Sequence, residues 1–446
     1  MAAIRARSIQ RPAQSAPPTP SRRRPPARQT PAGPVDRWIR QGTPQALREL
    51  QRLAGNQATT LVLQRSPKAP DPSKGERWND GKAYEIGRVF RVSVTGLKGG
   101  TSAKWQEDDS HHTTEPADHR AVVLVPDGFK PDQPTEVLLY FHGHNEAWRG
   151  RFAGWRQRTF KATKQTADEG LVSDDTVRDV ALDQIEQQIE SSGHTQMIGI
   201  LPQGGPQHQF GNIAGDDYIR DVLEKANKAQ PTVLKAVPDS WKVVLSGHSG
   251  GGWEVANQLS GAPRFKALEA IILFDAEGMK GEIARRIQED MTGLSDLAKT
   301  DVERTSLLDQ RPAVRVFARD KHKYGDMYGT VVEDTIADWT ANHRLSTGQK
   351  TLLARLRERD ACTAAPGKPA CRPLVVDDRR RMEQLGKRQE QMDAVTRFLP
   401  KLRGVYQVTL IDPSTVEHEE IIRGTKTSNA QYVKGEGNLE KGLRSL

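Results

Sequence analysis

Five residues, 247–251, constrain the fold of this chain more than any other segment. Their sequence is Gly-His-Ser-Gly-Gly, between the apolar run 241–245 and the helical pattern 253–259. Glycines two positions before and after Ser249 let a strand and a helix approach closely, because a glycine has no Cβ. The segment therefore predicts a strand, a sharp turn and a helix, with Ser249 raised above the end of the strand.

The net charge of +9 is concentrated at one end of the chain. Residues 1–65 contain twelve arginines, no lysine and two acidic residues, Asp36 and Glu49. The remaining residues carry 54 basic and 55 acidic side chains, so the main body is nearly neutral. A body that binds phosphates needs a basic surface, so we expect no nucleic-acid partner for it.

The sequence predicts that the chain is divided into three parts. Residues 1–45 form a Pro/Arg-rich tail with too few large apolar side chains to fold, and we expect them to be disordered. Residues 46–76 predict a short helical element and a linker, and residues 77–446 the main domain. No apolar stretch is long enough for a transmembrane segment, and none precedes a cleavage site as in a standard signal peptide.

Residues 50–65 contain the pattern L-Q-R-x-A-G-N followed by Leu63, Gln64 and Arg65. This pattern resembles a short element near the N-terminus of many bacterial proteins associated with extracellular contractile injection systems. The resemblance implies an export or loading tag, an injection-apparatus partner and export of a bacterial protein by a non-classical route. Otherwise the segment is a lone amphipathic helix that packs on the body, and the protein is cytoplasmic.

Beyond residue 76, apolar runs alternate with helical patterns, which predicts a mostly parallel eight-stranded sheet with helices on both faces. The first two strands, joined by a polar stretch, are expected to form an antiparallel edge. The expected strands are 87–94, 121–125, 136–141, 197–201, 242–245, 270–274, 313–317 and 405–411, and the expected helices are 176–190, 218–228, 253–259 and 281–291.

A large insertion, residues 321–403, separates the last two expected strands. It contains charged helical patterns at 350–359 and 377–397, and a segment of this size is typical of a cap or a partner surface. Cys362 and Cys371, the only cysteines, flank a Pro/Gly turn within it. They either close a small disulfide loop in an oxidising compartment or remain free thiols.

Two further segments resemble the α/β-hydrolase superfamily, and the resemblance extends over roughly residues 83–425. Residues 121–143 are similar to the strand–turn–strand–His-Gly opening of secreted esterases, and residues 200–205 to a Pro-Gln-Gly segment after their fourth strand. The resemblance implies an α/β-hydrolase fold and a serine hydrolase of the esterase or lipase type, with Ser249 as the nucleophile. A glycine-rich strand–helix turn without catalytic function is the alternative at Ser249.

Chain order in this superfamily places the catalytic base after the last strand. His418 lies there and is the only histidine beyond position 343. The acid is expected to be Asp275, which follows the strand 270–274, or else Asp320, which follows the strand 313–317 at the more usual place. Asp326 and Glu277 remain weaker alternatives.

The oxyanion hole is expected from two backbone segments. One amide comes from Gly250, directly after the nucleophile, and the other from His144 or Asn145, which follow Gly143 at the end of a strand. A glycine turn with surface histidines is the alternative for this second segment.

The expected substrate is a small-molecule or lipid ester, with an amide in second place. No nucleotide-binding fingerprint occurs, and His111, His112 and His119 lie in a polar loop pattern, so we expect neither a cofactor nor a metal. The alternative is a catalytically inactive α/β-hydrolase-like scaffold that serves as a binding or structural component of a secreted assembly.

Overall fold

The computed structural model describes part of the main domain, and residues 1–82, with the predicted tail and tag, lie outside it. The described residues are 83–86, 88–100, 119–144, 146–147, 158–159, 176–179, 183–204, 210–320, 328–364, 372–416, 418–424 and 435–446.

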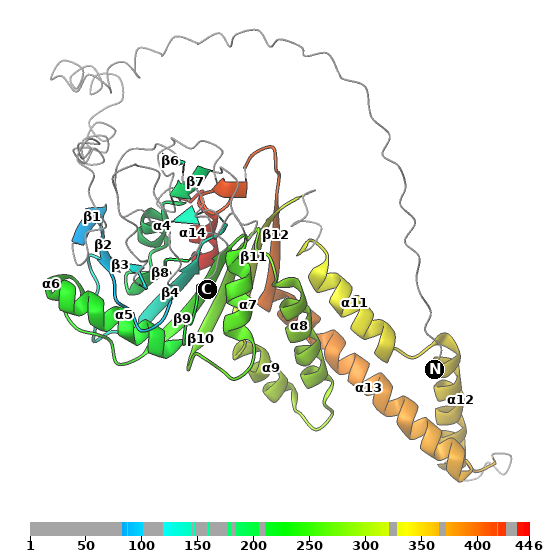
Figure 1. The fold of residues 1–446 in the computed structure, drawn as a ribbon. Helices are drawn as coiled ribbons and strands as arrows, with labels where there is room; N and C mark the ends of the chain where they lie inside the picture. The colour runs from blue at the N-terminus through cyan, green and yellow to red at the C-terminus, as the bar shows by residue number, and fades with distance from the viewer. Residues whose placement is uncertain are drawn as a thin grey trace, which may run out of the picture. The chain divides into compact units, whose positions relative to one another are not determined.

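A nine-stranded mixed sheet forms the centre of this domain (Figure 1), in the order β1-β2-β3-β8-β4-β9-β10-β11-β12. The strands from β8 to β12 in that order run parallel, while β3 is antiparallel to both of its neighbours. The bounds are β1 (Ala83–Ile86), β2 (Val89–Val94), β3 (Ala121–Pro126), β4 (Thr135–Phe141), β8 (Met197–Pro202), β9 (Trp241–His248), β10 (Leu268–Phe274), β11 (Ala313–Arg319) and β12 (Tyr406–Ile411).

All eight expected strands are present, and the antiparallel pairing of the first two is confirmed. The ninth strand, β1, extends the sheet beyond β2 and was not expected. The central strands are buried on both faces, which explains why they are continuous apolar runs rather than alternating patterns.

Helices cover both faces of the sheet (Figure 1). One hydrophobic cluster packs α5, α7, α8, α11 and α13 against the sheet, and a second packs α4 and α14 against the other face. The bounds are α4 (Ile185–Ser192), α5 (Asp216–Ala229), α6 (Pro231–Leu234), α7 (Gly251–Leu259), α8 (Lys280–Ser295), α9 (Asp301–Asp309), α11 (Val331–His343), α12 (Thr347–Ala364), α13 (Val376–Val405), α14 (Asn438–Arg444) and the 3-10 turn η2 (His418–Glu420).

The expected helix 176–190 is wrong in its first half. Residues Thr176–Asp179 form β7, the middle strand of a small three-stranded sheet with β5 (Glu146–Ala147) and β6 (Arg158–Thr159). The β-branched Thr176 and Val177 favour a strand. Gln184 has a left-handed backbone, with φ at 54°, so the helix begins only after it.

The insertion adds helices beside α8. Helix α12 packs on α13 around Leu345, Leu353 and Leu385, which form a small hydrophobic cluster of their own. The C-terminal half of α13 enters the main core through residues such as Val395. Cys362, at the end of α12, is disulfide-bonded, and Cys371, the only other cysteine of the chain, lies outside the described residues.

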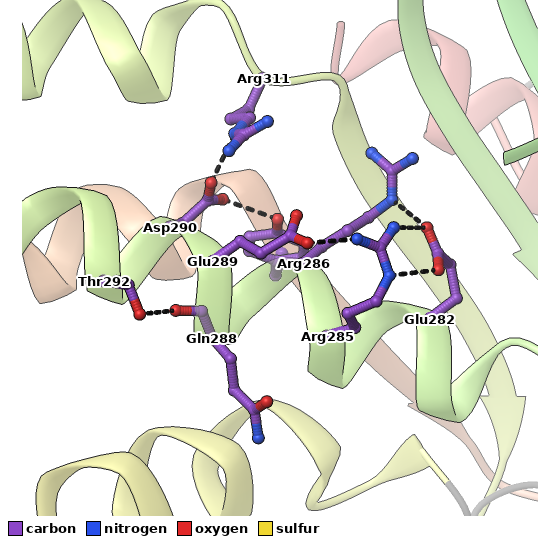
Figure 2. Close-up of polar contacts among 9 residues, drawn as sticks. Glu282, Arg285, Arg286, Gln288, Glu289, Asp290, Thr292 and Arg311 are labelled. Carbon is purple, nitrogen blue, oxygen red and sulfur yellow. Dashed lines mark hydrogen bonds and ion pairs between the residues drawn. The ribbon is translucent and has the colours of Figure 1, made fainter. Parts of the chain in front are cut away.

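Polar contacts on α8 anchor the point where the insertion returns to the sheet (Figure 2). Asp290 of α8 is fully buried and accepts hydrogen bonds from the Arg311 side chain and from the hydroxyl of Tyr406, which lies 2.7 Å away. Burial raises the pKa of Asp290, although Tyr406 and Arg311 oppose this effect. Since Tyr406 begins β12, these bonds hold the strand that leads to His418.

Candidate active site

Four neighbouring strands end at one edge of the sheet and bring together the side chains of the candidate site. Ser249 follows β9, Asp275 follows β10, Arg319 ends β11, and His418 lies in the loop after β12. Backbone bonds join the tips: the amide of Ser249 donates to the carbonyl of Phe274 over 3.0 Å, and that of Asp275 to the carbonyl of Phe317 over 2.9 Å. The carboxyl ends of parallel strands therefore assemble residues that lie far apart in the sequence.

Ser249 occupies the sharp turn that the sequence predicts. Its backbone is left-handed, with φ at 49°, and its side chain is only 6% exposed. A Cβ at Gly251 would lie 2.2 Å from the carbonyl oxygen of Phe141, and one at Gly247 would lie 2.9 Å from a methyl group of Val255. Strand, turn and helix therefore pack so closely that only glycine fits at these two positions.

Asp275 accepts hydrogen bonds from two residues. Its Oδ2 accepts from His418 Nδ1 over 3.0 Å and from Arg319 Nε over 2.7 Å. Its Oδ1 accepts from the backbone N–H of Arg319 over 2.8 Å. The structure therefore places Asp275, of the two leading candidates for the acid, against His418.

The protonation of this pair follows from its surroundings. Burial disfavours the ionised form of Asp275, but the hydrogen bonds from His418 and Arg319 outweigh it and lower the pKa of Asp275. Burial is also the largest effect on His418 and lowers its pKa, although the bond to Asp275 opposes it. At neutral pH the arrangement is an ionised Asp275 and a neutral His418 that carries its proton on Nδ1, which leaves Nε2 as the basic nitrogen.

The histidine beside the serine holds the loop of His418. The Nε2 of His248 lies 3.0 Å from the carbonyl oxygen of His418, and the centroids of the two rings are 4.8 Å apart. A carbonyl oxygen only accepts, so His248 donates from Nε2. Because His248 directly precedes Ser249, this bond ties the turn after β9 to the loop after β12.

A buried histidine supports the second expected oxyanion segment. His142 Nε2 accepts from the backbone N–H of Gly204 over 2.8 Å, so Nδ1 carries the proton and donates to the carbonyl oxygen of Gly143 over 2.9 Å. In a trans peptide the following N–H points opposite to the carbonyl. The amide of His144 is therefore directed away from the ring of His142.

Gly250 supplies the other expected amide. It is the N-cap of α7, and no hydrogen bond within the described residues uses its N–H. An N–H at the start of a helix is left without a partner by the helix itself and favours negative charge nearby. This amide suits an oxyanion formed next to Ser249.

The remaining candidates make other contacts or lie outside the described residues. Asp320 is half-buried, and its backbone N–H donates to the carbonyl of Ile411 over 2.7 Å, which continues the pairing of β11 with β12. The backbone N–H of Glu277 donates to the carbonyl of Ser249 over 2.7 Å and so supports the turn. Asn145 and Asp326 lie outside the described residues.

Sequence reasoning missed the contributions of Arg319, His248 and Gln203 to this site. Gln203 and Gly204 lie beside His142, so the Pro-Gln-Gly segment supports the candidate oxyanion segment. A signal for Arg319 existed, because a charged residue at the end of a buried parallel strand needs a partner. No sequence signal indicated which partner it has.

Over the residues that the structure describes, no helix is both long and apolar enough to cross a bilayer. In the same residues, no group of three or more His, Cys, Asp or Glu side chains is placed to hold a metal ion. His111 and His112 lie outside the described residues, and His119 Nδ1 lies 3.2 Å from the carbonyl oxygen of Gly100.

Comparisons with known proteins find likeness at the level of structure alone. No family model and no curated protein matches the chain. A mutant feruloyl esterase module from Clostridium thermocellum, complexed with sinapinate, is 12% identical, with a TM-score of 0.30, and the match covers 61% of this chain and 78% of that one. A peroxisomal α/β-hydrolase from Saccharomyces cerevisiae is 9% identical, with a TM-score of 0.26 and coverage of 69% and 99%.

A third structure, esterase 2 of Thermogutta terrifontis phosphoramylated by tabun, is 15% identical, with a TM-score of 0.23 and coverage of 55% and 78%. The fold itself follows from the geometry described above. A mixed sheet with helices on both faces, a Gly-x-Ser-x-Gly turn between β9 and α7, and a histidine after the last strand define the α/β-hydrolase fold.

Proposed function

We propose that this chain is a serine hydrolase that cleaves an ester bond by acyl transfer. The observation that carries the proposal is the hydrogen bond between His418 and the buried Asp275, next to the strained turn that presents Ser249. Nucleophile, acid and base follow one another along the chain in the order Ser, Asp, His, as the superfamily resemblance implies.

The first half of the reaction forms an acyl-enzyme. His418 Nε2 takes the proton of the Ser249 hydroxyl while the serine oxygen attacks the ester carbonyl. The amides of Gly250 and of His144 or Asn145 stabilise the negative oxygen of the tetrahedral intermediate. His418 then returns the proton to the leaving alcohol as the bond between the carbonyl carbon and that alcohol breaks.

The second half releases the acid product. Water attacks the acyl-enzyme and gives a proton to His418, which passes it to Ser249 as the serine ester breaks. Asp275 keeps its negative charge throughout and stabilises the imidazolium that forms twice in each cycle. An amide substrate follows the same steps with an amine as leaving group and is the second choice.

Labelling with a fluorophosphonate tests the proposal directly, because this reagent reacts with an activated serine. We expect one label on the wild-type protein and none on Ser249→Ala. Ser260→Ala is the matched control, because Ser260 is an exposed serine at the end of α7, and it should be labelled like the wild type. A wild-type protein that fails to react, or a reactive Ser249→Ala, would support the inactive scaffold instead.

The substrate class needs a second experiment. A panel of p-nitrophenyl esters of increasing chain length, phospholipids and aminoacyl amides should show turnover that depends on Ser249. We expect esters to be hydrolysed faster than the amides. Turnover of amides alone would make an amide, rather than an ester, the preferred substrate class.

The role of residues 50–65 is a separate proposal that rests on sequence similarity alone. We propose that this segment is an export or loading tag for an injection apparatus, which would make the hydrolase an exported effector. A reporter fused to residues 1–76 should be loaded into injection particles, and the same fusion without residues 50–65 should not. Loading of both fusions would contradict the proposal.

A further inference from the structure

Arg319 is a buried cation whose contacts centre on the carboxylate of Asp275. Its backbone N–H binds one carboxylate oxygen over 2.8 Å, and its Nε binds the other over 2.7 Å. The second oxygen also accepts from His418 Nδ1. Arg319 is 9% exposed and Asp275 fully buried, so these charges meet away from bulk water.

A cationic partner favours the ionised form of a buried carboxylate. A neutral histidine offers one N–H but no charge, whereas a guanidinium is charged at every relevant pH and its planar group holds a fixed direction. With donors on both of its oxygens, the carboxylate also loses its freedom to rotate. Arg319 therefore supplies both the charge balance and the orientation that the bond to His418 requires.

The same cation lowers the pKa of His418, whereas Asp275 raises it. Among the described residues, the imidazole interacts electrostatically with Asp275 after β10, His248 at the end of β9 and Arg319 at the end of β11. Burial is the largest cause of the lowered pKa of His418, Asp275 opposes it, and His248 and Arg319 add to it. Arg319, as a nearby cation, thus offsets part of the pull that Asp275 exerts on the proton.

We propose that Arg319 is a positioning residue of this site: its backbone N–H and its Nε hold both oxygens of Asp275 and direct that carboxylate at His418. The contribution of Arg319 to catalysis rests on the proposed function, whereas its effect on the titration of His418 does not. The more usual place for the acid of this fold is the end of β11; here the end of β11 provides the cation that pairs with an acid on β10.

The titration of His418, followed by NMR without any substrate, tests the proposal first. His418→Gln identifies its signal among the eleven histidines. In Arg319→Met, Asp275 still pairs with the imidazolium, and the loss of the nearby cation should let His418 take up its proton at a higher pH than in the wild type. Arg315→Met is the matched control: Arg315 is equally buried on β11, but its Nε donates to Ser445, and the titration of His418 should not move.

The pH profile of kcat/KM for a p-nitrophenyl ester gives the second readout. The acid limb of Arg319→Met should move upward with the titration, and the maximum should fall roughly tenfold. Arg319→Lys retains the charge without the planar Nε–H, so its titration should stay near that of the wild type while its maximum falls. A purely structural role would lower the folded fraction without moving the acid limb.

The outcomes separate the two proposals. An unchanged His418 titration in folded Arg319→Met overturns the role of Arg319, whatever the enzyme hydrolyses. If no ester or amide is hydrolysed, the proposed function fails. The NMR titration of His418 still tests the positioning role of Arg319. If Arg319→Met does not fold, Arg319→Gln replaces it in both experiments. If neither variant folds, kcat/KM of Arg319→Lys tests the proposal. A wild-type kcat/KM in Arg319→Lys then overturns the role of Arg319.

Discussion

At the scale of single residues, two adjacent strand ends have the same unusual backbone. Ser249 and Asp275 both have a positive φ, 49° and 42°, a conformation that costs free energy for any residue with a Cβ. Hydrogen bonds offset that cost, since the amide of Glu277 binds the carbonyl of Ser249 and Arg319 binds the Asp275 side chain. Such strain persists where the surroundings over-determine the geometry, which here is the candidate site.

Asparagine substitutions distinguish the two candidate acids. Asp275→Asn removes the negative charge opposite His418 Nδ1 and presents an amide that can also act as a donor, so the imidazole loses its correct tautomer. We expect kcat/KM to fall by roughly 10⁴ in this variant. In Asp320→Asn, kcat/KM should fall by less than about tenfold, which is smaller than the loss expected for a residue that takes part in proton transfer. A larger loss for Asp320→Asn would make Asp320 the acid.

The acid limb of the activity should lie lower than for an ordinary histidine. Burial lowers the pKa of His418 below 6.5, and the base works only when it is neutral. Activity is therefore fully present above the lowered pKa and is lost as the pH falls through it. The measurement is kcat/KM against pH with an uncharged ester, and half-maximal activity at or above pH 6.5 would contradict the prediction.

At the scale of elements, the unit that matters is β9, its turn and α7. The close approach at Gly251 couples this unit to the end of β4, because a Cβ there would meet the carbonyl oxygens of both Phe141 and His142. The turn that presents Ser249 and the loop that holds the second candidate oxyanion amide therefore share one contact. A change at this contact alters both parts of the site together.

Gly251→Ala should accordingly destabilise the fold by at least about 2 kcal/mol and abolish fluorophosphonate labelling. Gly281→Ala is the control, because a Cβ at that position of α8 meets nothing within 4 Å. Alanine is favoured over glycine in a helix, so this variant should keep its labelling and gain up to about 1 kcal/mol. Urea unfolding measures both effects, and equal stabilities would show that the turn relaxes easily.

At the scale of the whole molecule, the insertion divides into two parts with different roles in folding. The C-terminal half of α13 belongs to the main core through residues such as Val395 and Leu402. The hairpin of α12 and the first half of α13 has its own small cluster. The two parts meet where Arg388 Nε donates to the carbonyl of His343 over 2.6 Å, so the chain enters and leaves the hairpin at one place.

Replacing residues 345–386 with a short Gly/Ser linker should therefore leave the catalytic body folded. Because α12 and the first half of α13 are absent, the slope of the urea unfolding curve should decrease with the smaller surface exposed on unfolding. Labelling of Ser249 should persist at the wild-type rate. Loss of labelling in a folded variant would favour a cap over the site, whereas unchanged labelling favours a partner surface.

The sequence predicted much of the fold because the signals involved are local. Eight strands were found from apolar runs, since a strand buried on both faces must be apolar throughout. The helix expected over 176–190 is wrong in its first half, because the β-branched Thr176 and Val177 favour a strand despite the helical spacing. The edge strand β1 was missed, because a short strand paired on one side has a weak pattern.

For the candidate site, the sequence by itself determined the turn at Ser249, because glycine spacing between a strand and a helix is a local steric requirement. It also determined that His418 follows the last strand, because chain order can be read directly from the sequence. Only the tertiary structure decided which carboxylate faces His418 and which cation holds it. Asp275 and Arg319 are 44 residues apart, and the bond between them depends on how β10 and β11 pair side by side. Such a pairing has no local signature, because it arises only when the strands are assembled into the sheet.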